Sequence, residues 1–350
     1  MYIYILIMNS NTELVLDVND QFLYKKGFCG LQNLGNTCFM NSILQCISNT
    51  KPFLEFIFSS EFADSLNSEN PEYNLIVELK SVLIKLWDSN GCHSPRDFLR
   101  ELQKLSALKN RSEFTGFGQN DSQEFLQFLL EILHSGLARE VIMDIEGQPE
   151  NDFDKMAINA YKTYKRFFEN EYSDIIKLFY GQFFTKLEIT TNEKHEENYS
   201  FEPFSMLSLD IPDKDVDLYE CLDAFIETEL IINDDTQRIK KTVHFWSLPP
   251  VLIIFLKRYD NQLNKIDSVI DFPIELDMQK YVRGYDNSKV KFSLYAISNH
   301  GGGLGGGHYW SYIKNLDESW YRFDDSRVST QSVDSLISDS AYCLFYRKIE

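Results

Sequence analysis

The sequence lacks closely spaced cysteine pairs: no Cys-x-x-Cys motif occurs in its 350 residues. The six cysteines stand far apart, at positions 29, 38, 46, 92, 221 and 343. This scatter argues against a disulfide framework and suits a reducing compartment. We therefore expect free thiols in a cytoplasmic or nuclear protein.

Basic residues are also few, with 34 Lys and Arg against 53 Asp and Glu, which gives a formal net charge of −19. Such a field repels phosphate backbones and anionic lipid surfaces, so we expect neither a nucleic-acid nor a membrane partner. A basic peptide or protein patch would be attracted, although a merely soluble acidic surface explains the charge equally well. The apolar run from Met1 to Met8 is far shorter than the ~20 residues that span a bilayer, and we interpret it as an added strand or a tail.

Glycine is scarce, with 16 residues in all, yet six of the seven positions from Gly301 to Gly307 are glycine. Such a loop must be mobile or must need positive φ angles. The remaining composition is rich in apolar groups, with 43% hydrophobic and 14% aromatic residues, and can fill a large core. We expect one domain with subdomains, and a monomer.

Two helices and several strands can be predicted from periodicity. Apolar residues recur at helical spacing over 38–47, after a turn-forming segment at 33–36, and again from Asp121 to Leu133 with a stop at Gly136. Residues 251–256, 292–297, 308–313 and 341–346 are β-branched and aromatic runs that indicate strands. The pattern predicts an α+β architecture with a cleft between two lobes, joined by the acidic segment 140–175.

Cys38 is a candidate nucleophile because it lies at the start of the first predicted helix. A helix N-terminus and a nearby imidazolium lower the pKa of a thiol and make it reactive. Cys46 and Cys343 fit the alternative of a buried, inert cysteine, since both lie inside apolar runs. Asn33, on the turn that enters the helix, and the backbone N–H of Cys38 could stabilise an oxyanion, although Asn33 could also be an ordinary turn residue.

His308 is the histidine with the best geometric case for a general base. Two predicted strands flank the loop at 315–318, and an antiparallel hairpin centred on residue 316 puts Asp324 opposite or diagonal to His308. A carboxylate beside the second ring nitrogen would orient the imidazole. Taken alone, the FDDS string at 323–326 would also suit an acidic turn.

Together these motifs resemble those of the ubiquitin-specific protease family of deubiquitinases. The string GLQNLGNTCFMN at 30–41 resembles the family's cysteine box, and GGGHYWSY at 305–312, WYRFDDS at 320–326 and AYCLFY at 341–346 resemble its histidine box. QNDSQEFL at 119–126 is similar to an intermediate acidic box, and LPPVLIIFLKRY at 248–259 to a core strand.

The resemblance implies a papain-like cysteine protease fold with thumb, palm and fingers. It implies an N-terminal extension at 1–26 and a catalytic domain at 27–350, with the thumb at about 27–140, palm and fingers at 141–350, and the fingers near 180–245. The expected activity is cleavage of the isopeptide or peptide bond after the C-terminal glycine of ubiquitin. Ubiquitin and ubiquitinated proteins are the expected partners, and no cofactor is expected.

The same resemblance assigns roles to individual residues. It makes Cys38 the nucleophile, His308 the base, Asp324 the orienting residue, Asn33 an oxyanion donor and Asp325 an auxiliary. For substrate binding it implies Asp121 and Glu124, which would meet arginines of the ubiquitin tail, and Gly306, Gly307 and Tyr309 in and beside a mobile gate. Asp121 followed by Glu124 could instead be a helix cap.

One departure from the family concerns zinc, for which its fingers often carry two Cys-x-x-Cys pairs. The matching stretches here are Thr191 to Lys194 and about Leu230 to Asn233, which contain no cysteine. We therefore expect fingers without metal, held by packing of a strand at 183–189 against the stretch 229–232. Two other functions stay open, a catalytically silent ubiquitin-binding scaffold and a protease for a ubiquitin-like modifier.

Overall fold

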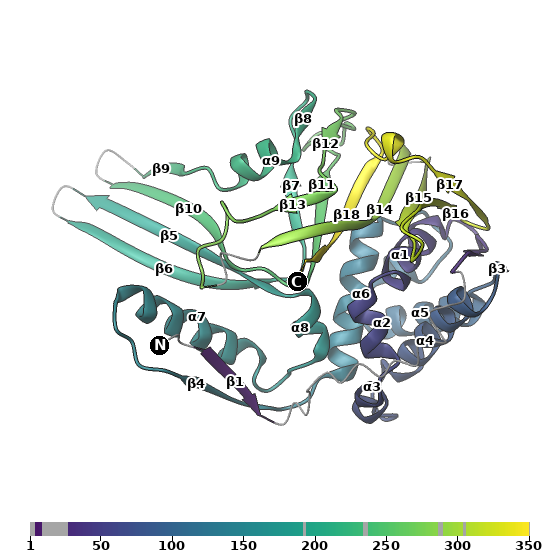
Figure 1. Cartoon of the computed structure of the whole chain (residues 1–350), viewed down its shortest axis with the longest axis horizontal. Helices are drawn as coiled ribbons and strands as arrows, with labels where there is room; N and C mark the ends of the chain where they lie inside the picture. The colour runs from purple at the N-terminus through teal and green to yellow at the C-terminus, as the bar shows by residue number, and fades with distance from the viewer. Residues whose placement is uncertain are drawn as a thin grey trace.

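The computed structural model of the chain describes residues 4–8, 27–191, 194–233, 237–285, 290–303 and 306–349. A helical part packs against a large β-sheet, and a narrower four-stranded sheet extends away from both (Figure 1). The predicted change from helices to strands near residue 180 is confirmed. Among the described residues, no helix is long and apolar enough to cross a bilayer.

The helical part begins with a short strand and continues through a series of helices that surround one apolar core. Its elements are β2 (Cys29–Leu31), α1 (Cys38–Ser48), α2 (Lys51–Ile57), α3 (Ser60–Ser65), α4 (Tyr73–Asp88), β3 (Gly91–His93), α5 (Arg96–Leu108), the 3-10 turn η1 (Ser112–Phe114) and α6 (Ser122–Leu137).

Helix α1 agrees with the prediction and lies between the other helices and the large sheet (Figure 1). All of its residues from Cys38 to Ser48 are buried, because α6 packs on one side and strands β14 (Lys291–Gly303) and β15 (Gly306–Lys314) pack on the other. The predicted burial of Cys46 and Cys343 is confirmed, and all six cysteines are free thiols.

Helix α6 also agrees with the prediction, except that Gly136 lies inside it rather than ending it. A Cβ at Gly136 would lie 2.4 Å from Cδ1 of Ile76 and 2.8 Å from Cβ of Glu72. The glycine therefore permits close packing of α6 on α4, and the helix continues to Leu137.

The large sheet has the strand order β17-β16-β15-β14-β18-β11-β7, with β13 paired to β14. The four β-branched and aromatic runs predicted as strands, 251–256, 292–297, 308–313 and 341–346, all lie in it. Besides β14 and β15, its strands are β7 (Leu207–Asp210), β11 (Val251–Lys257), β13 (Glu275–Asp277), β16 (Trp320–Asp324), β17 (Arg327–Gln331) and β18 (Ala341–Lys348). Smaller elements near it are β8 (Val216–Asp217), α9 (Leu218–Phe225), β12 (Ile270–Asp271) and η2 (Val333–Ser335).

The four-stranded sheet has the order β6-β5-β10-β9, formed by β5 (Gly181–Thr191), β6 (His195–Phe204), β9 (Glu229–Asn233) and β10 (Gln237–Ser247). The predicted strand at 183–189 is part of β5, but its predicted cover by 229–232 is wrong. Strand β10 lies between β5 and β9, so Leu230 and Ile232 stay exposed at the sheet edge. Aromatic rings cover β5 instead: Phe183 stacks on Phe204 at 4.1 Å between ring centroids, and Phe184 packs with Trp246.

The aromatic packing supports the expectation that the four-stranded sheet needs no metal, and this expectation can be tested directly. Treating the purified protein with a strong chelator should leave its melting temperature and any ubiquitin cleavage unchanged. A structural zinc site normally contributes on the order of 10 kcal/mol to its small fold, so its removal would be obvious. Stoichiometric zinc in the purified protein, or a drop in melting temperature on chelation, would contradict the expectation.

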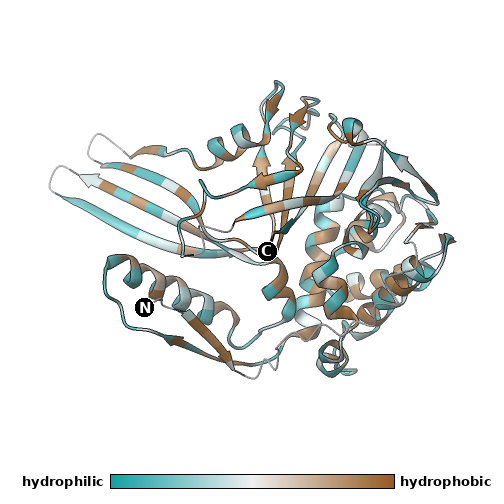
Figure 2. Cartoon of the chain, in the orientation of Figure 1, coloured by the Kyte–Doolittle hydropathy of each residue, from teal (hydrophilic) through white to brown (hydrophobic). Residues whose placement is uncertain are grey.

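The segment 140–175, expected to be a connection of weak periodicity, forms β4 (Ile142–Glu146), helix α7 (Asp152–Phe168) and the start of α8 (Asp174–Phe179). Ala157 and Ala160 of α7 pack against aromatic residues of the four-stranded sheet, and small residues on that face allow the close approach. Strand β1 (Tyr4–Met8) pairs with β4, so the N-terminal run is the added strand that the sequence allowed. Figure 2 shows apolar residues concentrated in this pair of strands.

Candidate active site

A tight turn at residues 33–37 directly precedes Cys38, the first residue of α1. The side-chain carbonyl of Asn33 accepts hydrogen bonds from the backbone N–H groups of Gly35 and Thr37, at 3.0 and 3.1 Å. Gly35 and Asn36 adopt positive φ angles of 107° and 58°. The turn reverses the chain over a few residues, so Cys38 begins the helix directly after it.

Cys38 is 5% exposed, and the surroundings of its thiol act on the thiol pKa in opposite directions. Burial raises the pKa of the thiol and the negative charge of Asp325 adds to this, while the backbone N–H of Tyr309 and those at the start of α1 lower it. The net direction is upward, opposite to the expectation from the helix N-terminus, because burial outweighs the N–H groups. Cys38 therefore needs a proton acceptor close by to become a thiolate.

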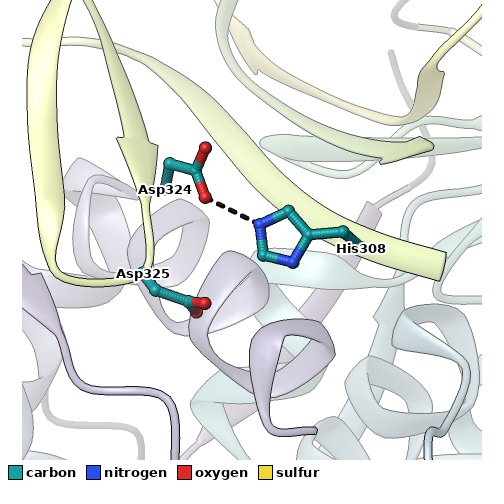
Figure 3. Close-up of side chains that lie close together, drawn as sticks. All are labelled: His308, Asp324 and Asp325. Carbon is teal, nitrogen blue, oxygen red and sulfur yellow. Dashed lines mark hydrogen bonds and ion pairs between the residues drawn. The ribbon is translucent and has the colours of Figure 1, made fainter.

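His308 and Asp324 form the contact that the sequence predicted. The Nε2 atom of His308 lies 2.7 Å from Oδ1 of Asp324 (Figure 3). The register of β15 and β16 pairs Ser311 with Phe323, so Asp324 is diagonal to His308 rather than opposite. Burial opposes ionisation of Asp324, but hydrogen bonds from His308 and Arg322 outweigh it and hold the pKa of the carboxyl below its ordinary value. The carboxylate is thus suited to orient the ring through Nε2, which leaves Nδ1 for another partner.

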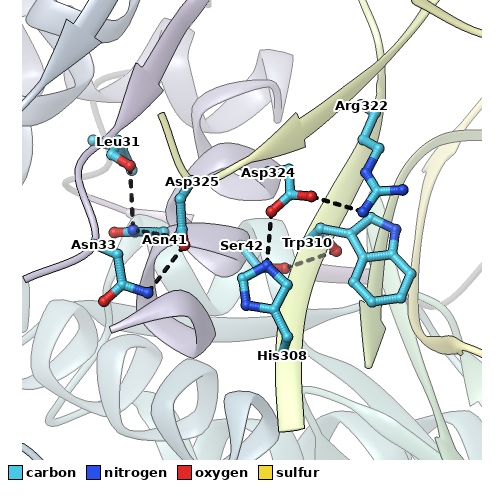
Figure 4. A network of polar contacts seen from close by, with 9 residues as sticks. All are labelled: Leu31, Asn33, Asn41, Ser42, His308, Trp310, Arg322, Asp324 and Asp325. Atoms are coloured by element: carbon cyan, nitrogen blue, oxygen red, sulfur yellow. Dashed lines mark hydrogen bonds and ion pairs between the residues drawn. The ribbon is translucent and has the colours of Figure 1, made fainter. Parts of the chain in front are cut away.

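Asp325 follows directly, in the two-residue turn between β16 and β17, with a positive φ of 50°. Its carboxylate accepts hydrogen bonds from the side-chain amides of Asn33 and Asn41, at 3.0 and 2.8 Å (Figure 4). Its backbone carbonyl accepts one from the backbone N–H of Leu31. Asp325 thereby ties the turn before Cys38 to the large sheet. The amide of Asn33, the predicted oxyanion donor, is held by this carboxylate.

His308, Asp324 and Asp325 are also, within the described ranges, the one group of three or more possible metal ligands that lie close together. Their ligand atoms lie within 4.8 Å of one another. Arg322, Asn33 and Asn41 already donate hydrogen bonds to the two carboxylates, so the arrangement is suited to orienting an imidazole.

Asp121 has the capping role that the sequence left open. Its Oδ1 accepts hydrogen bonds from the backbone N–H groups of Gln123 and Glu124, and its Oδ2 accepts one from the hydroxyl of Tyr342 at 2.7 Å and a longer one from Tyr309. Both oxygens of Asp121 are therefore used within the protein. Glu124 is exposed, and burial together with the charges of Asp121 and Glu113 raises the pKa of its carboxyl. Of the two predicted substrate-binding acids, Glu124 is the more available.

These contacts predict different results for charge reversal at the two positions. Asp121→Lys should lower the free energy of unfolding by about 2–4 kcal/mol, since it removes a helix cap and leaves the Tyr342 hydroxyl without its acceptor. Glu124→Lys should leave the melting temperature nearly unchanged and weaken ubiquitin binding, because it puts a cation where we expect a basic peptide. Chemical denaturation and binding titrations measure both effects, and equal stability of the two variants would contradict the assignment.

Gly306 and Gly307 belong to a strand rather than to a free loop. Gly301, Gly302 and Gly303 pair with His308, Gly307 and Gly306, so the glycine run extends the hairpin of β14 and β15. The middle of the predicted gate, 304–305, lies outside the described residues. A Cβ at Gly307 would lie 2.1 Å from Nε2 of His300, so a larger residue there would force the His300 ring to move.

Gly307 also links the two parts of the molecule, since its backbone N–H donates to the side-chain oxygen of Gln119 at 2.9 Å. Tyr309 is buried, and burial raises the pKa of its hydroxyl.

Sequence reasoning missed several side chains that support the predicted ones, because single motifs do not indicate contacts across the fold. They are Asn41, Gln119, His300, Trp310, Arg322 and Tyr342.

Comparison with known proteins adds independent evidence. The sequence model of the family described as ubiquitin carboxyl-terminal hydrolase matches residues 29–346. Ubiquitin carboxyl-terminal hydrolase Usp2 of Drosophila melanogaster is 34% identical over 341 residues, which cover 92% of this chain and 35% of that protein. Ubiquitin carboxyl-terminal hydrolase 2 of Homo sapiens is 32% identical over 342 residues, 92% of this chain and 55% of the relative. The chain thus spans about a third to a half of the length of these relatives.

Solved structures agree with the predicted fold class. The SAGA DUB module of Ubp8 with Sgf11, Sus1 and Sgf73, bound to monoubiquitin, matches with a TM-score of 0.72 at 26% identity, over 93% of this chain and 70% of the matched chain. The same module bound to ubiquitin aldehyde matches with a TM-score of 0.71. The predicted α+β fold of the ubiquitin-specific proteases is confirmed. Since the family model matches the chain almost from end to end, the chain belongs to the ubiquitin carboxyl-terminal hydrolase family.

Proposed function

We propose that the protein is a deubiquitinating thiol hydrolase that cleaves the isopeptide or peptide bond after the C-terminal glycine of ubiquitin. One observation carries the proposal: the Cys38 thiol lies beside the backbone N–H of Tyr309, the residue that follows the imidazole bonded to Asp324. These contacts support a nucleophile from α1, a base from β15 and an orienting carboxylate from β16. The family relationship supports ubiquitin as the modifier.

In the proposed mechanism, the free Nδ1 of His308 takes the proton of Cys38. The thiolate attacks the carbonyl carbon of the last ubiquitin glycine, and the carbonyl oxygen becomes an oxyanion. The backbone N–H of Cys38 and the side-chain amide of Asn33 are the proposed donors to that oxygen. Asp325, which accepts a hydrogen bond from Asn33, would keep this amide in position.

The tetrahedral intermediate then collapses as His308 returns the proton to the nitrogen of the leaving lysine. The C–N bond breaks, and the ubiquitin glycine remains bonded to Cys38 as a thioester. Water attacks this thioester with His308 again as the base, which releases the ubiquitin carboxylate and restores the thiol. The thiol must stay reduced for this chemistry, which suits a cytoplasmic or nuclear location.

Substrate recognition in this proposal uses the acidic surface near the start of α6 and the hairpin beside it. Glu124 would bind an arginine of the ubiquitin tail. Asp121 would act only through the electrostatic attraction of its negative charge, since both of its carboxylate oxygens already accept hydrogen bonds within the protein. Gly306 and Gly307, which have no side chains, and the buried Tyr309 would line the path of the C-terminal ubiquitin tail. Ubiquitin and ubiquitinated proteins are the proposed partners.

The test uses ubiquitin that carries an electrophile at its C-terminus. The proposal expects a covalent adduct on Cys38, located by mass spectrometry, and hydrolysis of a fluorogenic ubiquitin amide. Probes with the same electrophile on ubiquitin-like modifiers provide the matched comparison. Preferential reaction with one of them would identify a protease for that modifier, and ubiquitin binding without adduct or hydrolysis would identify a silent scaffold.

A further inference from the structure

One face of the hairpin formed by β15 and β16 carries His308 together with two large side chains that the proposed mechanism does not use. Side chains two residues apart on a strand point to the same face, so His308 and Trp310 share it on β15, and Arg322 and Asp324 share it on β16. The register pairs Tyr312 with Arg322, which makes Arg322 diagonal to Trp310. Figure 4 shows the four side chains gathered there.

Arg322 binds the oxygen of Asp324 that His308 does not. Its Nη2 donates to Oδ2 of Asp324 at 2.7 Å, while Oδ1 is the oxygen that contacts His308. A carboxylate held at both oxygens cannot rotate about its terminal bond without losing one partner. The guanidinium therefore fixes the direction in which Asp324 presents Oδ1.

Trp310 in turn fixes Arg322. The guanidinium carbon lies 4.8 Å from the centroid of the indole ring, within the range of a cation–π contact. The ring is also constrained on the hairpin, since a Cβ at Gly301 would lie 3.1 Å from its edge, and it stacks with the His308 ring at 6.3 Å between centroids. The indole thus forms a platform between the base and the arginine.

We propose that Arg322, braced by Trp310, is a positioning residue that locks Asp324 in the rotamer required to orient His308. This inference rests on the proposed hydrolase activity and deepens it. Asp324 alone would be a partly exposed carboxylate, with a side chain 28% exposed and free to turn toward solvent. Arg322 and Trp310 together restrict that freedom. The His308 imidazole is therefore already oriented by the folded hairpin before substrate binds.

The charge of Arg322 adds a second effect that a merely structural side chain would not have. The titratable or charged groups near His308 and Asp324 are Asp325, Arg322, His300 of β14, Cys38 of α1 and Arg327, which lies opposite Asp324 on β17. Arg322 is the cation among them that donates a hydrogen bond to Asp324. Its removal should make every neighbouring proton harder to release, so the pH profile of activity should move to higher pH.

The experiment measures kcat/KM against pH for hydrolysis of a fluorogenic ubiquitin amide by Arg322→Met, Arg322→Lys, Trp310→Thr and the double variant. We expect Arg322→Met to lose about tenfold in kcat, with KM nearly unchanged, well inside the ~100-fold that a displacement of 1 Å can cause. Its profile should shift upward by about half a pH unit. Arg322→Lys should restore most of the pH profile, and the loss in the double variant should be smaller than the product of the two single losses, since part of the Trp310 effect acts through Arg322.

Arg327→Met is the matched control. Arg327 pairs with Asp324 from the neighbouring strand β17 and is exposed, so this variant makes the same change of charge without touching the hydrogen bond to Oδ2. The inference would be overturned if Arg322→Met kept the wild-type kcat and pH profile. It would also be overturned if the losses of the two single variants were additive in the double variant, or if Arg327→Met shifted the pH profile as far as Arg322→Met does. Melting temperatures and titration of reactive Cys38 correct the rates for the folded fraction.

The outcomes separate this inference from the proposed function. If the wild-type protein hydrolyses no ubiquitin amide, the proposed function fails and the inference fails with it. If the wild-type protein is active and Arg322→Met is indistinguishable from it, only the inference fails.

Discussion

Replacing Cys38 by Ala should abolish ubiquitin hydrolysis, with a loss of at least ~10³-fold in kcat, and leave ubiquitin binding largely intact. The change removes the nucleophile but only one buried atom of a helix whose other residues hold its place. Turnover of a fluorogenic ubiquitin amide and the affinity for unmodified ubiquitin are the two measurements. Substantial turnover by the variant would contradict the mechanism.

Cys46→Ala is the matched control for this result. Cys46 lies two turns further along the same helix and is completely buried, which raises the pKa of its thiol well above the ordinary value. The control should lose some stability and keep its activity per folded molecule. Adduct formation on Cys46 in the Cys38→Ala protein would show that the nucleophile had been assigned to the wrong cysteine.

His308→Ala should cost about 10³- to 10⁴-fold in kcat, and Asp324→Ala should cost less, about 10- to 100-fold. The base moves the proton in each step, whereas the carboxylate only orients the ring that does so. Asp325 can replace Asp324 only by giving up its hydrogen bonds with Asn33 and Asn41, so its rescue is partial. Steady-state kinetics of both variants provide the comparison.

Asp334→Ala is the control for the loss of one carboxylate near the same sheet, since Asp334 is exposed in the short turn η2. It should match the wild-type protein. Equal losses for His308→Ala and Asp324→Ala, or a larger loss for Asp324→Ala, would mean that the orienting role belongs to another residue.

Much of this site could be predicted because its signals are local. The helix after Cys38 follows from apolar spacing within its own residues, and the contact of His308 with Asp324 follows from one hairpin with a short loop. The predicted hairpin centre differs from the observed register by a single residue, which still leaves the two side chains in contact. Diagonal and directly opposed neighbours are both within reach on a sheet.

The features that sequence reasoning missed depend on residues far apart in the chain. Asn33 and Asp325 are 292 positions apart, so no local pattern could reveal their hydrogen bond. The same limit applies to the pKa of Cys38, for which burial by the assembled fold outweighs the helix terminus. Strand β10, lying between β5 and β9, illustrates a further limit, because several pairings of amphipathic strands satisfy one hydrophobic pattern.

Helix α1 has no solvent-facing side, so substitutions in it should affect both the stability and the activity of the protein in the cell. A surface helix can accept many substitutions without effect, but every residue of α1 is buried, and its apolar side chains belong to the core on which the position of the thiol depends. A smaller residue at Ile43 or Leu44 would leave a cavity in the core around this helix and lower stability together with rate. Conservative alleles in this helix should therefore behave as temperature-sensitive mutants, active in cool cells and inactive in warm ones.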